Sequence, residues 1–68
     1  MSNKKNNQWR QNKKIAIARA TRLSENLEKI MFVIYDNEEE RYDIVDEGDL
    51  YHLIEEFDLD ADIVAEIG

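Results

Sequence analysis

The chain has 68 residues, with sixteen Asp and Glu against nine Lys and Arg, and a formal net charge of −7 at pH 7. It contains no cysteine, which excludes disulfide bonds and thiolate zinc sites, so a single small apolar core must hold the fold together. The polar first residues do not resemble a secretory signal, and the longest apolar run, Ile30 to Tyr35, is too short to cross a membrane, so we expect a cytoplasmic protein.

The charge is divided unevenly along the sequence. Residues 1–30 carry eight Lys and Arg against two Glu, which gives a net charge of +6. Residues 31–68 carry a single cation, Arg41, against fourteen Asp and Glu, which gives −13. Such an asymmetry is typical of a chain that interacts with a charged partner.

The N-terminal third predicts a polar segment followed by an amphipathic helix. Residues 1–7 are polar and unpatterned, so we expect a flexible N-terminus ahead of a single α+β domain over residues 8–68. From about residue 8 to residue 29, apolar side chains recur at helical spacing. The apolar stripe consists of Trp9, Ala16, Ala20, Leu23, Leu27 and Ile30.

The middle of the chain predicts a two-stranded antiparallel hairpin. The run "IMFVIY" at 30–35 combines β-branched and aromatic residues, "RYDIV" at 41–45 alternates, and "DNEEE" at 36–40 is turn-like. We expect one face of the hairpin to pack against the helices, through Ile30, Phe32, Ile34, Tyr42 and Ile44. The other face, with Met31, Val33, Tyr35, Asp43 and Val45, has no predicted cover, which leaves a homodimer open.

Two helices are predicted after the hairpin. Asp46 can cap the first one, and Leu50, Leu53, Ile54 and Phe57 then follow at helical spacing. The stretch "DLDADIVAEIG" at 58–68 has the same pattern of an aspartate cap followed by apolar residues, with Asp60 as the cap. It predicts a last short helix, either separate from the preceding helix or continuous with it. The expected order is therefore α-β-β-α-α.

Catalytic and metal-binding motifs find little support in the sequence. There is no cysteine and no Gly-rich phosphate loop, and the single histidine, His52, is followed by Glu55 and Glu56. A histidine and a carboxylate supply two ligands where a zinc site needs three or four, so we interpret His52 as a surface residue. The "DLDAD" run resembles the start of a calcium loop, but Ile63 stands where that loop needs glycine. We expect no enzyme, no metal and no cofactor.

The basic N-terminal segment supports an alternative function. Cationic side chains around an aromatic residue are typical of nucleic-acid contact. The cations are Lys4, Lys5, Arg10, Lys13, Lys14, Arg19 and Arg22, and the aromatic residue is Trp9. Two observations argue against nucleic-acid binding. The net charge of −7 repels phosphate, and Trp9 lies on the apolar stripe, where it is expected to pack in the core. A small nucleic-acid-binding protein acting through residues 4–22 remains the alternative.

The acidic half offers a stronger signal, although a run of charge is most often a solvated surface. Its carboxylates are interleaved with apolar residues at strand and helix spacing, which indicates that they lie on ordered elements. Alternate strand residues lie about 6.6–7 Å apart, a scale similar to that of phosphates along a DNA strand. An ordered array of this kind can occupy the basic groove of a DNA-binding protein.

The chain is small, has no cysteine, and carries an acidic hairpin and helices in "FVIYDNEEERYDIVDEGDLYHLIEEFDLD" at 32–60. In these features it resembles, over residues 31–66, the small acidic phage-encoded inhibitors that mimic DNA, including host-takeover proteins. The resemblance implies a non-enzymatic protein in the host cytoplasm. It also implies a partner with a basic DNA-binding surface: a nucleoid protein such as the histone-like protein HU, RNA polymerase or a nuclease. The seven cations of residues 1–24 depart from that class.

If the acidic half mimics DNA, the partner-binding residues are expected to be acids of the predicted turn, second strand and following helix, with Tyr35 as an aromatic anchor. These acids are Glu38, Glu39, Glu40, Asp43, Asp46, Glu47, Asp49, Glu55 and Glu56. We expect neither a membrane partner nor direct contact with nucleic acid.

Overall fold

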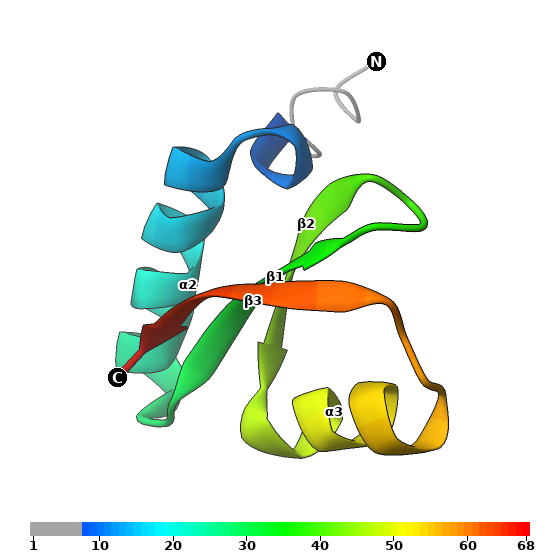
Figure 1. Ribbon diagram of the computed structural model, residues 1–68. Helices are drawn as coiled ribbons and strands as arrows, with labels where there is room; N and C mark the ends of the chain where they lie inside the picture. The colour runs from blue at the N-terminus through cyan, green and yellow to red at the C-terminus, as the bar shows by residue number, and fades with distance from the viewer. Residues whose placement is uncertain (1–7) are drawn as a thin grey trace.

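The structure is a computed structural model that describes residues 8–68, which form a three-stranded antiparallel sheet with helical segments packed against it (Figure 1). In chain order the elements are η1 (Gln8–Gln11), α2 (Lys13–Leu27), β1 (Met31–Asp36), β2 (Arg41–Asp46), α3 (Glu47–Tyr51), η2 (His52–Glu56) and β3 (Ala61–Ile67). The sheet order is β2-β1-β3, and the predicted α+β class is confirmed. The predicted flexible segment 1–7, with Lys4 and Lys5, lies outside the described residues.

The predicted N-terminal helix is divided at Asn12. The backbone of Asn12 is extended, and its side chain accepts the N–H of Ile15 at 3.2 Å, so the residue caps α2 instead of continuing a helix from η1. At the other end Glu28 adopts the left-handed conformation, and its N–H donates to the carbonyl of Ser24. The helix therefore ends at Leu27, two residues before the predicted end.

The pairing of β1 with β2 corrects the predicted faces of the hairpin. Asp36 lies opposite Arg41, and the same register places Phe32 opposite Val45 and Val33 opposite Ile44. Directly opposite residues in an antiparallel pair point to the same face. Phe32 therefore shares a face with Val45, and Ile44 lies on the other side. The predicted grouping assumed a pairing shifted by one residue, which exchanges the faces of a whole strand.

The last predicted helix is wrong, because residues 61–67 form β3. This strand pairs antiparallel with β1, from Asp36 opposite Ala61 to Met31 opposite Ile67. A bulge at Val64 adds one residue to β3 between the partners of Val33 and Ile34. The order is thus α-β-β-α-β, and the hairpin is two strands of a three-stranded sheet. Three β-branched residues in a seven-residue segment favour a strand, and pairing with β1 overrides the short helical period.

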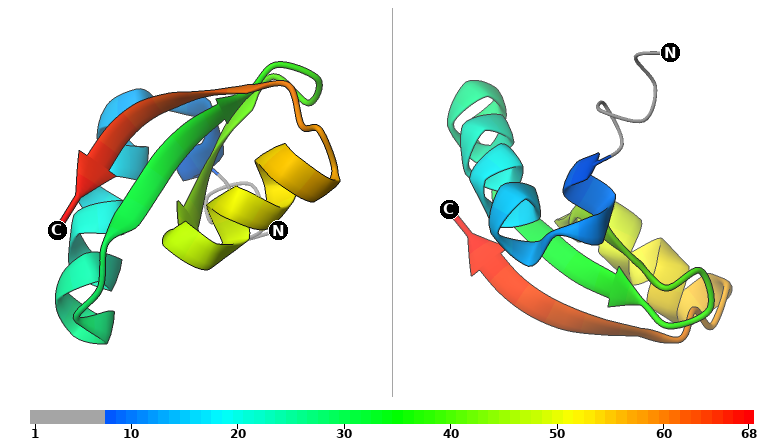
Figure 2. Two further views of the ribbon diagram at one scale, coloured as in Figure 1. Left: turned by 60° about the horizontal axis from the view of Figure 1, so that its bottom comes forward. Right: turned by 90° about the horizontal axis from the view of Figure 1, so that it is seen from above.

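The apolar core has two parts, one on each face of β1. The backbone views in Figure 2 show α2 and α3 at separate places around the sheet. Met31 and Val33 pack with Trp9 of η1 and with Ala16 and Ala20 of α2. On the other face are Phe32, Ile34 and Val45, packed with Leu50, Leu53, Leu59 and Ala61. The face that was expected to lack a cover is therefore covered. Burial on both sides explains why β1 is a continuous apolar run and not an alternating one.

Candidate functional site

The turn between β1 and β2 holds three exposed glutamates on a fixed backbone. The buried carboxylate of Asp36 accepts the N–H of Glu38 at 2.9 Å and that of Glu39 at 3.1 Å. The N–H of Glu40 donates to the Asp36 carbonyl at 2.7 Å. The predicted turn at residues 36–40 is confirmed. The side chains of Glu38, Glu39 and Glu40 point from this turn into solvent.

The start of β3 brings two more carboxylates to the same turn. The backbone N–H of Asn37 donates to the carbonyl of Asp60 at 2.9 Å. Its side-chain amide donates to the carboxylates of Asp60 at 3.1 Å and of Asp62 at 3.3 Å. The acidic tip is defined here as Glu38, Glu39, Glu40, Asp60 and Asp62. All five side chains are exposed.

Sequence reasoning missed Asp60 and Asp62 because it placed them on a helix, where Asp60 was a cap. The signal that could have found them is the set of β-branched residues Ile63, Val64 and Ile67, which favours a strand. A third strand next to β1 begins beside the turn where β1 ends, and so carries its first acids there.

Within the described part of the chain, no Lys or Arg forms an ion pair with the tip. Among residues 8–68 Lys29 forms an ion pair with Asp46, and a ring nitrogen of His52 lies 3.0 Å from the Glu56 carboxylate. Arg41, the one cation of the acidic half, is half-buried opposite Asp36 and makes no ion pair with the acids of the tip in the described part of the chain. Five carboxylates held together in this way repel one another, which lowers stability unless a partner neutralises them.

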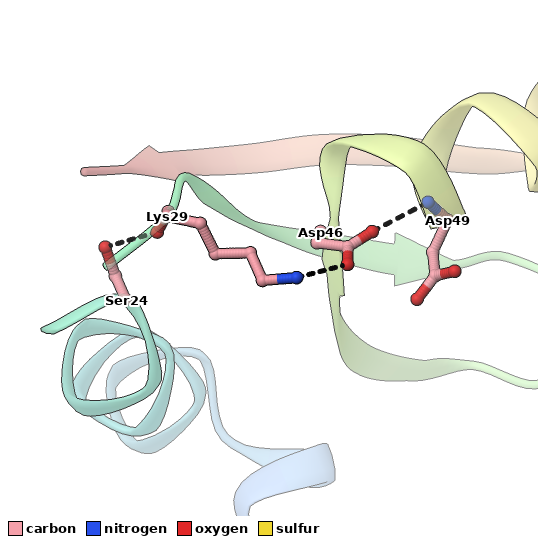
Figure 3. Close-up of polar contacts among 4 residues, drawn as sticks. All are labelled: Ser24, Lys29, Asp46 and Asp49. Atoms are coloured by element: carbon pink, nitrogen blue, oxygen red, sulfur yellow. Dashed lines mark hydrogen bonds and ion pairs between the residues drawn. The ribbon is translucent and has the colours of Figure 1, made fainter. Parts of the chain in front are cut away.

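A second acidic group lies at the opposite end of β2, about 17 Å from the tip for a strand of this length. Asp46 caps α3 there, as predicted, and accepts the N–H of Asp49 at 2.8 Å. Its other carboxylate oxygen accepts from the Lys29 ammonium at 3.0 Å (Figure 3). The Asp49 N–H, and after it Lys29, lowers the pKa of Asp46 below its ordinary value. Glu47 and Asp49 are exposed beside it.

The remaining predicted residues lie elsewhere. Glu55 and Glu56 are exposed on η2, where Glu56 pairs with His52 at 3.0 Å. Asp43 is half-buried, and its carboxylate accepts the N–H of Ile44. Tyr35 is half-buried and packs edge-on against Tyr42, with ring centroids 5.0 Å apart. The predicted residues therefore occupy several places instead of one continuous surface.

Most cations of residues 8–68 lie on α2 and η1, the exceptions being Lys29 and Arg41. Lys13, Lys14, Arg19 and Arg22 are exposed. The guanidinium groups of Arg10 and Arg19 lie over the ring of Trp9, at 4.6 and 5.2 Å from its centroid. Trp9 is only 9% exposed, so its predicted place in the core is confirmed. A ring covered in this way is not free to stack on a nucleic-acid base.

Residues 8–68 were also compared with the features of a metal site, a ligand pocket and a membrane span. No group of three or more His, Asp or Glu side chains in this range could hold a metal ion. A surface pocket of about 360 Å³ lies between the end of α2 and Gly68, lined by Glu25, Glu28 and Lys29 among others. No helix in the described part of the chain is long and apolar enough to span a membrane.

Comparisons of the chain with protein-family models, with curated proteins and with solved structures found no match.

Proposed function

We propose that this protein is a non-enzymatic acidic inhibitor, which mimics DNA and binds the basic DNA-binding surface of a host protein. A nucleoid protein such as HU, RNA polymerase or a nuclease has a surface of this kind. The observation that carries the proposal is the acidic tip, where five exposed carboxylates stand on a hydrogen-bonded frame without a Lys or Arg partner among residues 8–68.

A fixed frame matters because binding is weakened by every group that must first be ordered. The turn is already held by Asp36, and Asn37 holds the start of β3 against it. The tip can therefore present its charges together at little entropic cost. A basic surface that binds DNA releases counterions and attracts its ligand over a distance, and an acidic protein array gains the same steering.

The acids differ in whether their side chains make contacts inside the fold, and this difference also supports the proposal. Asp36 holds the turn and Asp46 caps α3, so these two carboxylates act inside the fold. Glu38, Glu39 and Glu40 make no side-chain hydrogen bond or ion pair with described residues, and they are exposed. Crowded charge without an internal partner is destabilising, and a basic partner would relieve it.

The competing function is nucleic-acid binding through the cations of α2. Lys13, Lys14 and Arg22 are exposed on this helix and make no ion pair with described residues, which is the observation in its favour. Truncation of the basic segment cannot test it, because Ala16 and Ala20 of the same helix are fully buried in the core. Neutralising Lys13→Gln, Lys14→Gln and Arg22→Gln together leaves the buried face intact.

Two experiments in sequence test the proposal. The immobilised protein is first used to capture partners from a bacterial lysate, with elution by a salt gradient. We expect a basic DNA-binding protein that elutes at high salt. The captured protein is then bound to a labelled DNA duplex, and the acidic protein is titrated against that complex. Release of the DNA, measured by fluorescence anisotropy, is the expected result.

A gel shift with DNA and RNA separates the two functions. The acidic protein alone should shift neither. If it shifts nucleic acid, loses that shift in the triple α2 variant and releases no DNA from a basic partner, the nucleic-acid-binding alternative replaces the proposal.

A further inference from the structure

The outer edge of β3 is open in the described structure. β3 is the longest of the three strands and lies at the edge of the sheet, paired with β1 (Figure 1). None of residues 8–68 pairs with its outer side. The other edge strand, β2, has η1 packed against it. An unpaired edge presents backbone N–H and C=O groups on which a further strand can form.

Exposed apolar side chains lie next to this edge. Ile63 faces the side of the sheet that α3 covers, opposite Ile34, but α3 packs against β2 and β1, and Ile63 is 53% exposed. Phe57, in the connection from η2 to β3, is 71% exposed. A strand added beside β3 would give Ile63 a neighbour on its own face.

The charge on β3 selects the kind of strand that can be added. Asp62 lies opposite Tyr35 on one face, and Glu66 lies opposite Phe32 on the other. No Lys or Arg occurs in residues 42–68. A second copy paired through β3 would bring its own Asp62 and Glu66 to the same edge and no cation, and crowding of like charge is destabilising. The edge is therefore matched to a basic strand and mismatched to its own copy.

We propose that β3 binds an extended basic segment of the partner protein as a fourth, antiparallel strand. The inference rests on the proposed function in one respect, namely that the partner is basic. Backbone hydrogen bonds give such strand addition its affinity, and side chains at alternate positions give it specificity. The antiparallel direction follows the rest of the sheet and is slightly more stable per residue than the parallel one.

The bulge determines the sequence pattern that fits. Four consecutive residues of β1 pair with β3 across the bulge, and Val64 of β3 is left without a partner. The pairs are Phe32 with Glu66, Val33 with Ala65, Ile34 with Ile63, and Tyr35 with Asp62. A partner strand that spans the bulge as β1 does places a cation opposite Glu66, then any residue, an apolar residue opposite Ile63, and a cation opposite Asp62. The segment thus reads basic, any, apolar, basic.

A synthetic peptide tests the inference directly. The probe is a labelled peptide with the core Lys-Thr-Val-Lys flanked by threonines, and a scrambled peptide of equal charge is its control. Two further peptides carry backbone N-methyl groups on one or the other alternate set of residues, because only one set can donate hydrogen bonds to β3. Affinity is measured by fluorescence anisotropy at physiological salt, and protection of the β3 amides by hydrogen exchange.

The expected result has three parts. The probe binds more tightly than its scramble, one methylated peptide loses at least about tenfold in affinity while the other does not, and the β3 amides gain protection. The variant Asp62→Asn/Glu66→Gln should weaken probe binding about tenfold. The matched variant Glu38→Gln/Glu39→Gln removes the same charge from the tip, and should change the affinity less than about threefold.

Three results would overturn the inference. Equal binding of the two methylated peptides means that no strand is added. Equal weakening by the β3 and tip variants means that only net charge matters. Protection, in the free protein, of the β3 amides that point away from β1, together with dimers in sedimentation, means that a second copy already covers the edge. A protein that releases DNA from its partner but fails these tests retains the proposed function and loses this inference alone.

Discussion

Lys29 and Asp46 form an ion pair, with the Lys29 ammonium 3.0 Å from a carboxylate oxygen of Asp46 (Figure 3). The pair connects the loop before β1 to the junction between β2 and α3. The other oxygen of the same carboxylate accepts the Asp49 N–H at 2.8 Å and so caps α3. The sequence predicted that Asp46 both caps a helix and binds the partner. In the structure its two carboxylate oxygens both make contacts inside the fold.

Substitution Asp46→Asn should reduce the pH dependence of stability in acid. The pKa of Asp46 is lowered below 3.8, first by the Asp49 N–H and then by Lys29. A carboxylate with a lowered pKa in the folded state stabilises the fold above its unfolded pKa, and this contribution is lost as the pH falls from there through the folded pKa. Asparagine is also a good helix cap, so the variant isolates the charge.

Thermal unfolding followed by circular dichroism from neutral pH to below pH 3.8 measures this effect. The wild-type melting temperature should fall more steeply than that of Asp46→Asn at the acid end of the range. Lys29→Gln keeps the cap and should remove a smaller part of the difference, because the Asp49 N–H is the larger cause. Parallel curves for wild type and Asp46→Asn would show that the carboxylate has no such role.

Substitution Ser24→Ala should destabilise the fold by about 1–2 kcal/mol, because it removes the hydrogen bond that the buried Ser24 hydroxyl donates to the Lys29 carbonyl. The Ser24 hydroxyl is buried near the end of α2 and donates to the Lys29 carbonyl at 2.8 Å, with the Ile67 carbonyl of β3 at 3.4 Å. Urea unfolding measures the change. The neighbouring exposed Glu25→Ala is the control, and an equal loss in both variants would contradict the structural role of Ser24.

The position of Ile34 at the centre of the sheet predicts a large effect of truncation. Ile34 is 1% exposed and lies between Asp43 of β2 and Ile63 of β3. Ile34→Ala should lower the free energy of unfolding by about 2–5 kcal/mol, the range for buried Ile or Leu. Ile63→Ala removes the same atoms from a side chain that is 53% exposed, and should cost less. Similar losses in both variants would argue against the placement of β3 at an open edge.

Local patterns in the sequence were enough to predict α2, the hairpin and the start of α3. The stripe containing Ala16 and Ala20 has helical spacing, and both residues are fully buried. The side chains of Asp36 and Asp46 form the turn and the cap that their types indicate. Each of these features depends on residues close together in the chain.

The features that sequence reasoning missed depend on distant contacts. Residues 61–67 become a strand because β1, about thirty residues earlier, offers its edge, and the short Ile63–Ile67 pattern is compatible with either a helix or a strand. The error in this segment also hid Asp60 and Asp62 from the predicted site. The faces of the hairpin were exchanged because the register depends on the pairing of Asp36 with Arg41, which composition does not specify.

The acidic tip is the central element of the proposed function, and a matched pair of charge reversals tests it most directly. Glu38→Lys/Glu39→Lys places four units of charge change on the tip. Glu25→Lys/Glu28→Lys makes the same change at the exposed end of α2, away from the β1–β2 turn. Circular dichroism confirms that both variants are folded, and the affinity of each for the captured basic partner is then measured by titration at physiological salt.

The proposal predicts that the tip variant loses about a hundredfold in affinity while the α2 variant loses less than about tenfold, because the tip charges contact the partner and those of Glu25 and Glu28 do not. Equal losses in the two variants, or unchanged binding by the tip variant, would contradict the proposal that the tip is the partner-binding surface.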